Sequence, residues 1–316
     1  MQLSLNELKG LYFGAYSFAE TEDGYLQSFQ FTQEQMDYFQ KTSNFWYDRC
    51  RACSAKTIEF LTKAEGLSFE YKILWKGSDD SFEVAVDGLP SQIWYVKDMA
   101  EEGRIDCRLP GGEKSVVLYL PVDATVLIRG FEITGNTVRP HKEAKVLWLG
   151  DSITQGYGPL RSAQSYVSVA NRLLNYDVLN QGIGGYVYDR HSLMRMDGYM
   201  PDKIIVAFGT NQYMEPSMRA VEEYYEALIS LYGIQIPVLC ITPIWRGDAL
   251  DTLPKLKRFC ENTQSIASQY SNVLTVDGFE LVPHLPEYYL DGLHPNSLGA
   301  EVYGRNLAAF IRASGF

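Results

Sequence analysis

The second half of this chain alternates short apolar, strand-like runs with amphipathic helical runs, and this alternation restricts the fold more than any other feature. The strand-like runs cover residues 146–149, 178–180, 204–208, 238–241 and 273–276. Helical candidates lie between them near 162–174, 217–232 and 252–269, and a last one covers about 298–312. Strands that alternate with helices predict a parallel sheet, because the crossover between two parallel strands is usually a helix. We therefore expect a three-layer α/β/α domain.

The first half of the chain has a different pattern. Short β-branched and aromatic runs are separated by Gly, Asp and Ser, and helical periodicity is nearly absent. Asp87-Gly88-Leu89 predicts a turn between strands at 82–86 and 92–96, and Pro121 is expected at a strand edge. Such strands predict an all-β sandwich with a jelly-roll arrangement. The polar stretch TGNTVRPHKEA, 134–144, is the expected linker, so the domains are predicted at 1–138 and 139–316.

The composition excludes several classes of partner. The 316 residues are 46% hydrophobic and 21% charged, which is ordinary for a globular protein with a sizeable core. A formal net charge of -11 argues against binding to nucleic acid or to an anionic membrane. No apolar run approaches the length of a membrane span.

Two features of the sequence bear on the cellular compartment of the protein. The N-terminal sequence MQLSLNELKG lacks the basic and apolar regions of a signal peptide, so we expect a cytoplasmic protein. The five cysteines, an odd number, fit a reducing compartment better than a disulfide framework. The pair Cys50-Arg-Ala-Cys53 has the spacing of a redox or half-zinc site, but without a second pair it is interpreted as two packed thiols in a strand.

Polar and glycine-rich segments follow the predicted parallel strands. In an open parallel sheet, ligands bind beyond the carboxyl ends of the strands. The segments that arrive there are Gly150-Asp151-Ser152, Asn180-Gln181-Gly182-Ile183-Gly184-Gly185, Gly209-Thr210-Asn211-Gln212, Thr242-Pro243-Ile244-Trp245-Arg246 and, in a longer loop, Asp291-Gly292-Leu293-His294-Pro295-Asn296. The sequence therefore predicts one site at this edge.

The residue types at that edge fit acyl transfer. A serine hydroxyl such as that of Ser152 becomes a good nucleophile only when a base removes its proton, and His294 is the obvious base. Asp291, three residues earlier, can orient the imidazole. The oxyanion needs fixed donors, and the candidates are the backbone N–H groups of Gly182 and Ser152 and the side-chain amide of Asn211.

Other interpretations of these residues are simpler. Ser152 alone would be an ordinary helix N-cap, and Asp291 alone a turn-forming residue. Asp151, Trp245 and Arg246 are candidate substrate-binding residues. For Trp245 and Arg246 the alternative is packing at the interface with the sandwich.

The ordered blocks Gly-Asp-Ser-Ile-Thr, Asn-x-Gly, Gly-Thr-Asn and Asp-x-x-His resemble those of the SGNH (GDSL) hydrolase superfamily. The resemblance covers about 150 residues and implies a flavodoxin-like α/β/α domain. By this resemblance, Ser152, Gly182, Asn211, Asp291 and His294 take the catalytic roles. One departure is Gln212, where many relatives have Asp after the Asn.

The predicted jelly roll ahead of that domain resembles carbohydrate esterase family two. In some of those enzymes the acid is missing and a backbone carbonyl orients the histidine. The resemblance therefore leaves open whether Asp291 completes a triad or a Ser152–His294 dyad operates.

Together these observations predict a serine esterase that needs no metal and no cofactor. Its expected substrate is a short acyl ester, most simply an acetyl ester, of a carbohydrate or related small molecule. Glycine-rich nucleotide loops, Gly-x-Ser-x-Gly elbows and metalloprotease motifs are absent from the sequence. Two alternatives stay open: a thioesterase or lysophospholipase with the same site, and a carbohydrate-binding protein with an idle hydrolase site. The sequence carries no signal for oligomeric state.

Overall fold

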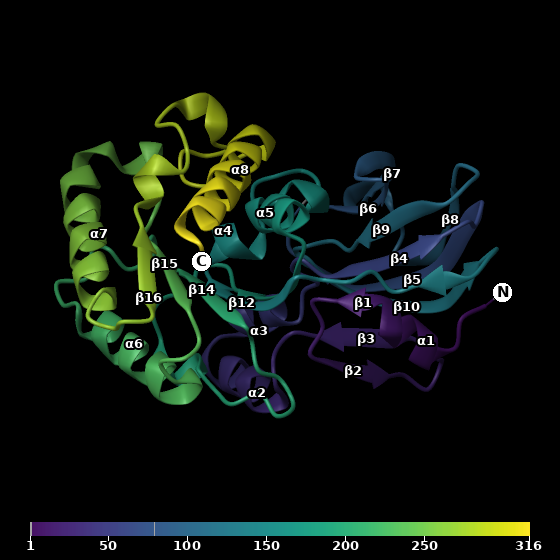
Figure 1. The fold of residues 1–316 in the computed structure, drawn as a ribbon, viewed down its shortest axis with the longest axis horizontal. Coiled ribbons are helices and arrows are strands. Elements are labelled where there is room, and N and C mark those ends of the chain that lie inside the picture. The colour runs from purple at the N-terminus through teal and green to yellow at the C-terminus, as the bar shows by residue number, and fades with distance from the viewer. Residues whose placement is uncertain (1, 79) are drawn as a thin grey trace.

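The parallel sheet predicted for the second half is present, and all five of its strands are confirmed. The structure is a computed structural model that describes residues 2–78 and 80–316. The strands are β12 (Ala144–Gly150), β13 (Tyr176–Gly182), β14 (Lys203–Ala207), β15 (Val238–Ile241) and β16 (Val273–Val276). They lie in the order β13-β12-β14-β15-β16, all parallel. Figure 1 shows β12, β14, β15 and β16 of this sheet. This is the flavodoxin-like order, whose ligand crevice lies where the chain switches direction, between β12 and β14.

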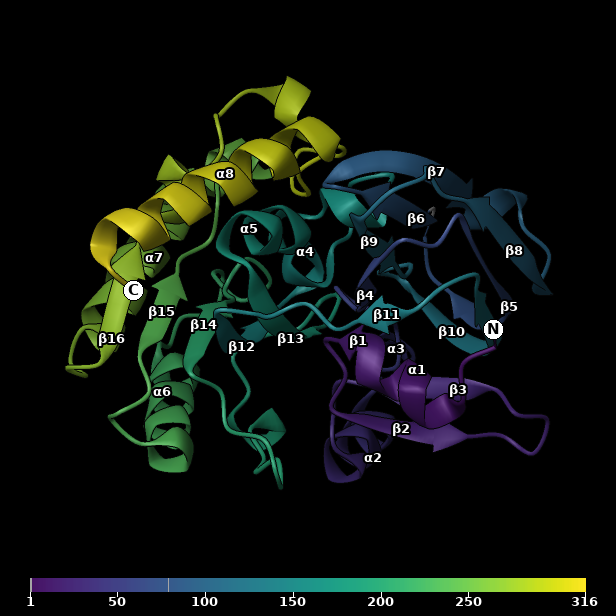
Figure 2. The same ribbon diagram turned by 45° about the vertical axis from the view of Figure 1, so that its right-hand side comes forward.

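Helices cover both faces of this sheet, as the alternation predicts. They are α5 (Tyr166–Leu174), α6 (Arg219–Tyr232), α7 (Leu253–Ala267) and α8 (Ser297–Ser314). Successive side chains of a strand point to opposite faces. Val146 and Trp148 therefore pack with α5 and α8, whereas Leu147 and Leu149 pack with α6 and α7. Figure 2 shows α8 and α6 on opposite sides of the sheet.

The first half contains two antiparallel sheets that enclose their own core. One has the order β1-β4-β9-β6-β7, with β11 paired to β4, and the other has the order β2-β3-β10-β5-β8. Figure 2 labels all of these strands. The strands are β1 (Tyr12–Phe13), β2 (Ser17–Glu20), β3 (Leu26–Phe29), β4 (Thr57–Thr62), β5 (Gly66–Lys76), β6 (Ser81–Val86), β7 (Leu89–Tyr95), β8 (Glu102–Arg108), β9 (Lys114–Tyr119), β10 (Ala124–Ile133) and β11 (Thr137–Val138). Phe60, Phe69, Phe82 and Phe131 pack between the sheets. The jelly-roll connectivity stays a prediction.

Two local predictions can be compared with this part of the fold. The turn between β6 and β7 is confirmed, with Asp87 and Gly88 at φ 48° and 78°, the left-handed region that such hairpin turns require. Pro121 lies between β9 and β10 rather than within a strand.

The prediction of an all-β first half is wrong for its first fifty residues. These contain α1 (Leu5–Leu11), α2 (Gln33–Thr42) and α3 (Asn44–Cys50). Helix α2 has a capping box, in which the Thr32 side chain accepts from the Gln35 backbone and the Gln35 side chain accepts from the Thr32 backbone. Two of these helices are only seven residues long, too short to show a helical period in the sequence.

Helices α2 and α3 also join the two halves. Phe39 and Cys50 belong to the same apolar core as Leu149 and Ile183 of the second half. The boundary between 138 and 139 therefore stays a prediction, because hydrophobic packing crosses it. Cys50 ends α3 rather than lying in a strand, and all five cysteines are buried and unpaired in the described residues. Within the same residues, no helix has the length and apolar character needed to cross a membrane.

Candidate active site

Ser152 stands at the sharp turn between strand β12 and the short helix α4 (Ser152–Gln155). Asp151 caps this helix, because its Oδ1 accepts from the Ile153 N–H at 3.0 Å. A Cβ at Gly150 would lie 2.1 Å from Thr154 Oγ1, so the turn requires glycine there. Ser152 is therefore the first residue of a helix, at the carboxyl edge of the sheet.

Ser152, His294 and Asp291 form a continuous hydrogen-bonded chain. Ser152 Oγ lies 2.9 Å from His294 Nε2, and His294 Nδ1 lies 2.8 Å from Asp291 Oδ2. The other oxygen of Asp291 accepts from the backbone N–H groups of Leu293 and His294, at 3.0 and 2.8 Å. The ring of Tyr157 meets the imidazole edge-on, with the centroids 4.6 Å apart. The loop between β16 and α8 thus holds the histidine against the serine.

The Asp291 carboxyl is held in its charged form. Burial by itself would raise its pKa, but hydrogen bonds from the backbone N–H groups of His294 and Leu293 and from the His294 ring lower the pKa below its ordinary value. A negative carboxylate is the form that can stabilise an imidazolium.

A pocket of about 360 Å³ opens over the serine. Its lining residues are Phe45, Arg49, Gly77, Asp123, Ser152, Gln155, Tyr157, Gly184, Gly185, Asn211, Asp291, Leu293 and His294. The first four come from the first half of the chain, so both halves build the site.

Asn211 points an amide toward the same pocket. Its Nδ2 donates one hydrogen to the carbonyl of Tyr186 at 2.9 Å, which fixes the plane of the amide and leaves the second hydrogen available. Within the described residues, neither the Ser152 N–H nor the Gly185 N–H donates to a protein acceptor. These three residues line the same pocket, and their N–H groups are available there as donors.

The donor role predicted for Gly182 does not fit this geometry. Its N–H donates to Asn180 Oδ1 at 2.8 Å, so it is already used. Gly182 is buried, and a Cβ there would lie 2.4 Å from the Gln155 nitrogen, so its glycine allows α4 to pack closely on β13. Gly184 and Gly185 line the pocket instead. Three glycines within four residues cannot be told apart by the sequence pattern alone.

Residues 148–302 match the model of the GDSL-like Lipase/Acylhydrolase family. This chain carries a GDSL-like hydrolase domain. The match covers all the segments that supply the serine, the asparagine and the Asp–His pair. The protein is therefore an esterase of the GDSL type. A search of curated proteins returned no match.

Solved structures show the same fold over most of the chain. The salicylyl-acyltransferase SsfX3 from a tetracycline biosynthetic pathway is similar with a TM-score of 0.78 and 18% identity, over 96% of this chain and 94% of that one. A putative GDSL-like lipase from Bacteroides ovatus ATCC 8483 has a TM-score of 0.75 and 16% identity, over 99% and 97%. A family two carbohydrate esterase from Clostridium thermocellum, in complex with cellohexaose, has a TM-score of 0.64 and 21% identity, over 83% and 93%.

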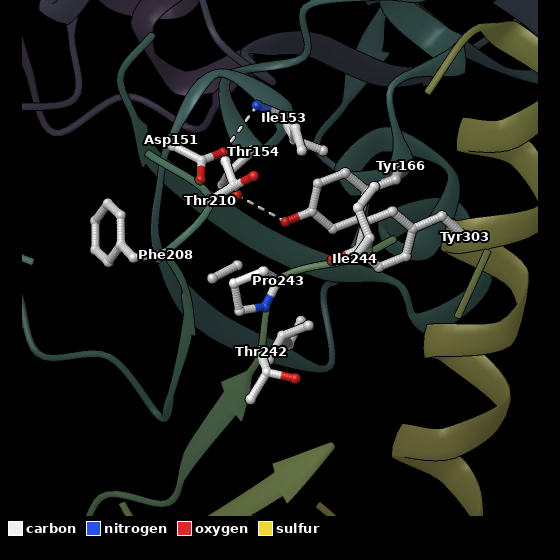
Figure 3. A pocket seen from close by; sticks show the side chains of 12 residues that line it. Asp151, Ile153, Thr154, Tyr166, Phe208, Thr210, Thr242, Pro243, Ile244 and Tyr303 are labelled. Atoms are coloured by element: carbon white, nitrogen blue, oxygen red, sulfur yellow. Dashed lines mark hydrogen bonds between the residues drawn. The ribbon is translucent and has the colours of Figure 1, made fainter. Parts of the chain in front are cut away.

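Asp151, predicted to bind substrate, lies elsewhere in this GDSL-like hydrolase. Its side chain faces a small cavity of about 20 Å³ together with Thr154 and Tyr166 (Figure 3). Burial raises the pKa of its carboxyl to about 7. The carboxyl therefore supports the nucleophile turn from inside, as the helix cap, and does not line the pocket over Ser152.

Trp245 and Arg246 do not line the pocket over the serine either. Trp245 is 8% exposed and stacks on His284, with the ring planes 11° apart, inside the second half of the chain. Arg246 Nη1 donates to the Thr210 carbonyl at 2.8 Å, and its other nitrogens pair with Asp248. Arg246 thus supports the peptide that precedes Asn211, and neither residue packs at the interface with the sandwich as the alternative supposed.

Sequence reasoning missed the contribution of the first half to the site. Gln155 Nε2 donates to Asp123 Oδ1 at 2.6 Å, and Gln155 Oε1 accepts from the Gly184 N–H at 2.7 Å. The Ser54 hydroxyl donates to the Gln155 carbonyl at 2.6 Å. The nucleophile helix and the glycine-rich loop are therefore tied to the sandwich. No local motif marks these partners, which lie tens of residues from Ser152 in the sequence.

The described residues contain no group of three or more His, Cys, Asp or Glu side chains placed to hold a metal ion. The groups that the site brings together are a hydroxyl, an imidazole, a carboxylate and N–H donors.

Proposed function

We propose that this protein is a serine esterase that removes short acyl groups, most simply acetyl, from a carbohydrate or a related small molecule. The observation that carries the proposal is the hydrogen-bonded chain from Ser152 Oγ through the His294 ring to Asp291. Nucleophile, base and orienting acid within direct hydrogen-bond reach form the arrangement that acyl transfer requires.

The proposed reaction has two halves. In the first, Ser152 Oγ attacks the ester carbonyl while His294 Nε2 takes its proton, and the tetrahedral intermediate then expels the alcohol, which receives that proton. In the second, a water attacks the acyl-serine while His294 takes its proton. The bond between Ser152 Oγ and the acyl carbon then breaks, Oγ takes the proton back from His294, and the carboxylic acid leaves. Asp291 fixes the tautomer and stabilises the imidazolium formed in both halves.

The oxyanion of the tetrahedral intermediate is proposed to meet three donors. These are the Ser152 N–H, the free hydrogen of the Asn211 amide and the Gly185 N–H, which takes the place predicted for Gly182. Gly185 is exposed at the pocket and its φ of 71° suits glycine. Each such donor lowers the barrier because it is already oriented before the charge develops.

The volume of the pocket and the solved structures with the same fold support a short acyl ester of a sugar as the substrate. A pocket of about 360 Å³ is at the small end for ligand sites, which favours a short acyl chain and one sugar-sized unit. Family two carbohydrate esterases and an acetyl xylan esterase from Butyrivibrio proteoclasticus are among the structures with this fold.

A second candidate is transfer of the acyl group to an alcohol other than water. The observation that favours it is the likeness over nearly the whole chain to a salicylyl-acyltransferase. Both reactions pass through the same acyl-serine, so they differ only in what attacks it.

Two further points remain proposals. We place the protein in a reducing compartment, the cytoplasm, because five buried cysteines without a disulfide among the described residues fit such a compartment. We also propose that the two antiparallel sheets form a jelly roll.

The test is hydrolysis of 4-nitrophenyl esters from acetate to octanoate, beside acetylated sugars, by the wild type and by Ser152→Ala. We expect a preference for the shortest acyl groups and a loss of at least about 10³-fold in Ser152→Ala. Ser217→Ala, at an exposed serine, is the matched control. An added alcohol that diverts the acyl group from water would favour the transferase, and an active Ser152→Ala would reject the site.

A further inference from the structure

Arg49 is the arginine in the wall of the pocket over Ser152, and it comes from α3 in the first half of the chain. We propose that Arg49 binds an anionic group of the substrate, so that the enzyme prefers esters that carry a carboxylate or a similar anion. This inference rests on the proposed esterase function and names the substrate class within it.

The Arg49 side chain is held in place before any substrate arrives. Its guanidinium carbon lies 3.5 Å from the centroid of the Phe45 ring and 5.3 Å from that of Trp75. A Cβ at Gly184 would lie 2.8 Å from Arg49 Cδ, so the stem packs directly on the glycine-rich loop. A side chain fixed by such contacts loses less conformational entropy when it binds a ligand.

The guanidinium also has unused donors. Its Nη1 donates to the Phe45 carbonyl at 3.2 Å, and among the described residues its other N–H groups have no hydrogen-bond partner. Other arginines of the molecule differ in this respect: Arg51 pairs with Asp48 at 2.9 Å and Arg246 with Asp248 at 2.6 Å. In the described part of the chain, Arg49 forms no such ion pair.

The two carboxylates of the pocket have partners of their own. Asp291 binds the His294 ring, and Asp123 accepts from Gln155 Nε2. Burial raises the pKa of Asp123, although the nearby positive charge of Arg49 opposes that rise. Among the described residues, the Arg49 guanidinium in the lining of this pocket therefore has no hydrogen-bonded partner of opposite charge.

A planar guanidinium with free N–H groups matches a carboxylate, sulfate or phosphate, which it can bind through two parallel hydrogen bonds. The formal net charge of -11 gives the protein no general attraction for anions. A preference for an anionic ester would thus come from this contact. Charge-assisted hydrogen bonds of this kind correspond to a discrimination of about tenfold to a hundredfold.

The anion can belong to the alcohol or to the acyl group, and two pairs of esters separate these cases. For the alcohol side, 4-acetoxybenzoate is compared with 4-acetoxybenzamide. For the acyl side, 4-nitrophenyl hydrogen adipate is compared with 4-nitrophenyl hexanoate. The quantity measured is the ratio of kcat/KM for the anionic ester to that for the neutral ester.

We expect this ratio to exceed about ten in one pair for the wild type and to fall by about tenfold to a hundredfold in Arg49→Gln. Arg49→Lys keeps the positive charge but lacks the two parallel N–H donors of the guanidinium, and should retain part of the preference for the anionic ester. The matched control is Arg51→Gln, two residues away but paired with Asp48 and outside the pocket lining, which should keep the wild-type ratio.

The inference would be overturned if Arg49→Gln still hydrolysed the neutral esters and kept the wild-type kcat/KM ratio in both pairs. Failure of the wild type to hydrolyse any of the four esters would instead reject the proposed function, and the inference with it. Circular dichroism of each variant shows that the fold is kept.

Discussion

Replacing Asp291 by asparagine distinguishes a full triad from a Ser152–His294 dyad. In the wild type, Asp291 Oδ1 accepts from two backbone N–H groups and Oδ2 faces His294 Nδ1. The asparagine oxygen should take the place of Oδ1, because only an acceptor can satisfy those two N–H groups. Its NH₂ then faces Nδ1 at about the same 2.8 Å.

This orientation reverses the tautomer of the histidine. An NH₂ can only donate, so Nδ1 must become the acceptor and Nε2 must carry the hydrogen. Nε2 faces Ser152 Oγ at 2.9 Å and can then no longer remove its proton. The charge that stabilises the imidazolium is also lost. The expected fall in kcat/KM is on the order of 10³–10⁴-fold, which is about 4–5.5 kcal/mol of transition-state stabilisation.

The assay is kcat/KM for 4-nitrophenyl acetate at one pH, for the wild type, Asp291→Asn and His294→Ala. Asp251→Asn, at an exposed aspartate, is the control for the chemical change alone. Asp291→Asn should approach the loss in His294→Ala, and Asp251→Asn should match the wild type.

An Asp291→Asn variant within about tenfold of the wild type would refute this reasoning. His294 would then be oriented by another group, and Asp291 would serve only to shape the loop through its bonds to the backbone.

Three further outcomes follow from the geometry. Asn211→Ala should lower kcat by roughly 10²–10³-fold with little change in KM, and a change confined to KM would show that the amide binds substrate instead of the developing charge. Gln155→Leu removes the bridge between Asp123 and the Gly184 N–H, so kcat should fall by roughly tenfold or more at nearly constant KM, and an unchanged kcat would mean that the loop holds its shape without the bridge. Burial raises the pKa of Asp151 from 3.8 to about 7, so between these pH values the native state binds more protons than the unfolded state. The free energy of unfolding therefore falls as the pH rises through that window, by at most about 1.4 kcal/mol per pH unit. Asp151→Asn keeps a capping oxygen but cannot titrate, so its unfolding free energy should depend less on pH there, and equal slopes would contradict the assignment.

Much of the second half could be predicted because its pattern is local. A strand of five to seven residues buried on both faces reads as a short apolar run, and a helix such as α7 shows a clear period on its buried side. The first fifty residues gave no such signal. Helices of seven to ten residues next to short strands carry too few positions for either period to be evident.

The candidate site also has a part that the sequence predicts and a part that it does not. Ser152, Asn211 and the Asp291–His294 pair each follow a parallel strand, so one topological rule brings them to one edge. Gly182 lies at the carboxyl end of a strand as well, but its N–H donates to Asn180 Oδ1. Whether a backbone N–H group is free to bind an oxyanion depends on the side chains around it, and the topological rule for parallel strands does not describe those side chains.

The sequence by itself determined the parallel sheet, the succession of strands and helices along the chain, and the edge at which the reactive groups meet. Hydrophobic periodicity is a property of neighbouring residues, and the alternation of strands with helices extends it to a parallel layer. Only the tertiary structure decided what surrounds those groups. It brings Arg49 and Asp123 into the pocket over Ser152 and turns Trp245 into the core of the second half. Contacts of this kind join residues far apart in the chain, and they depend on how two separately formed layers pack, for which no local pattern exists.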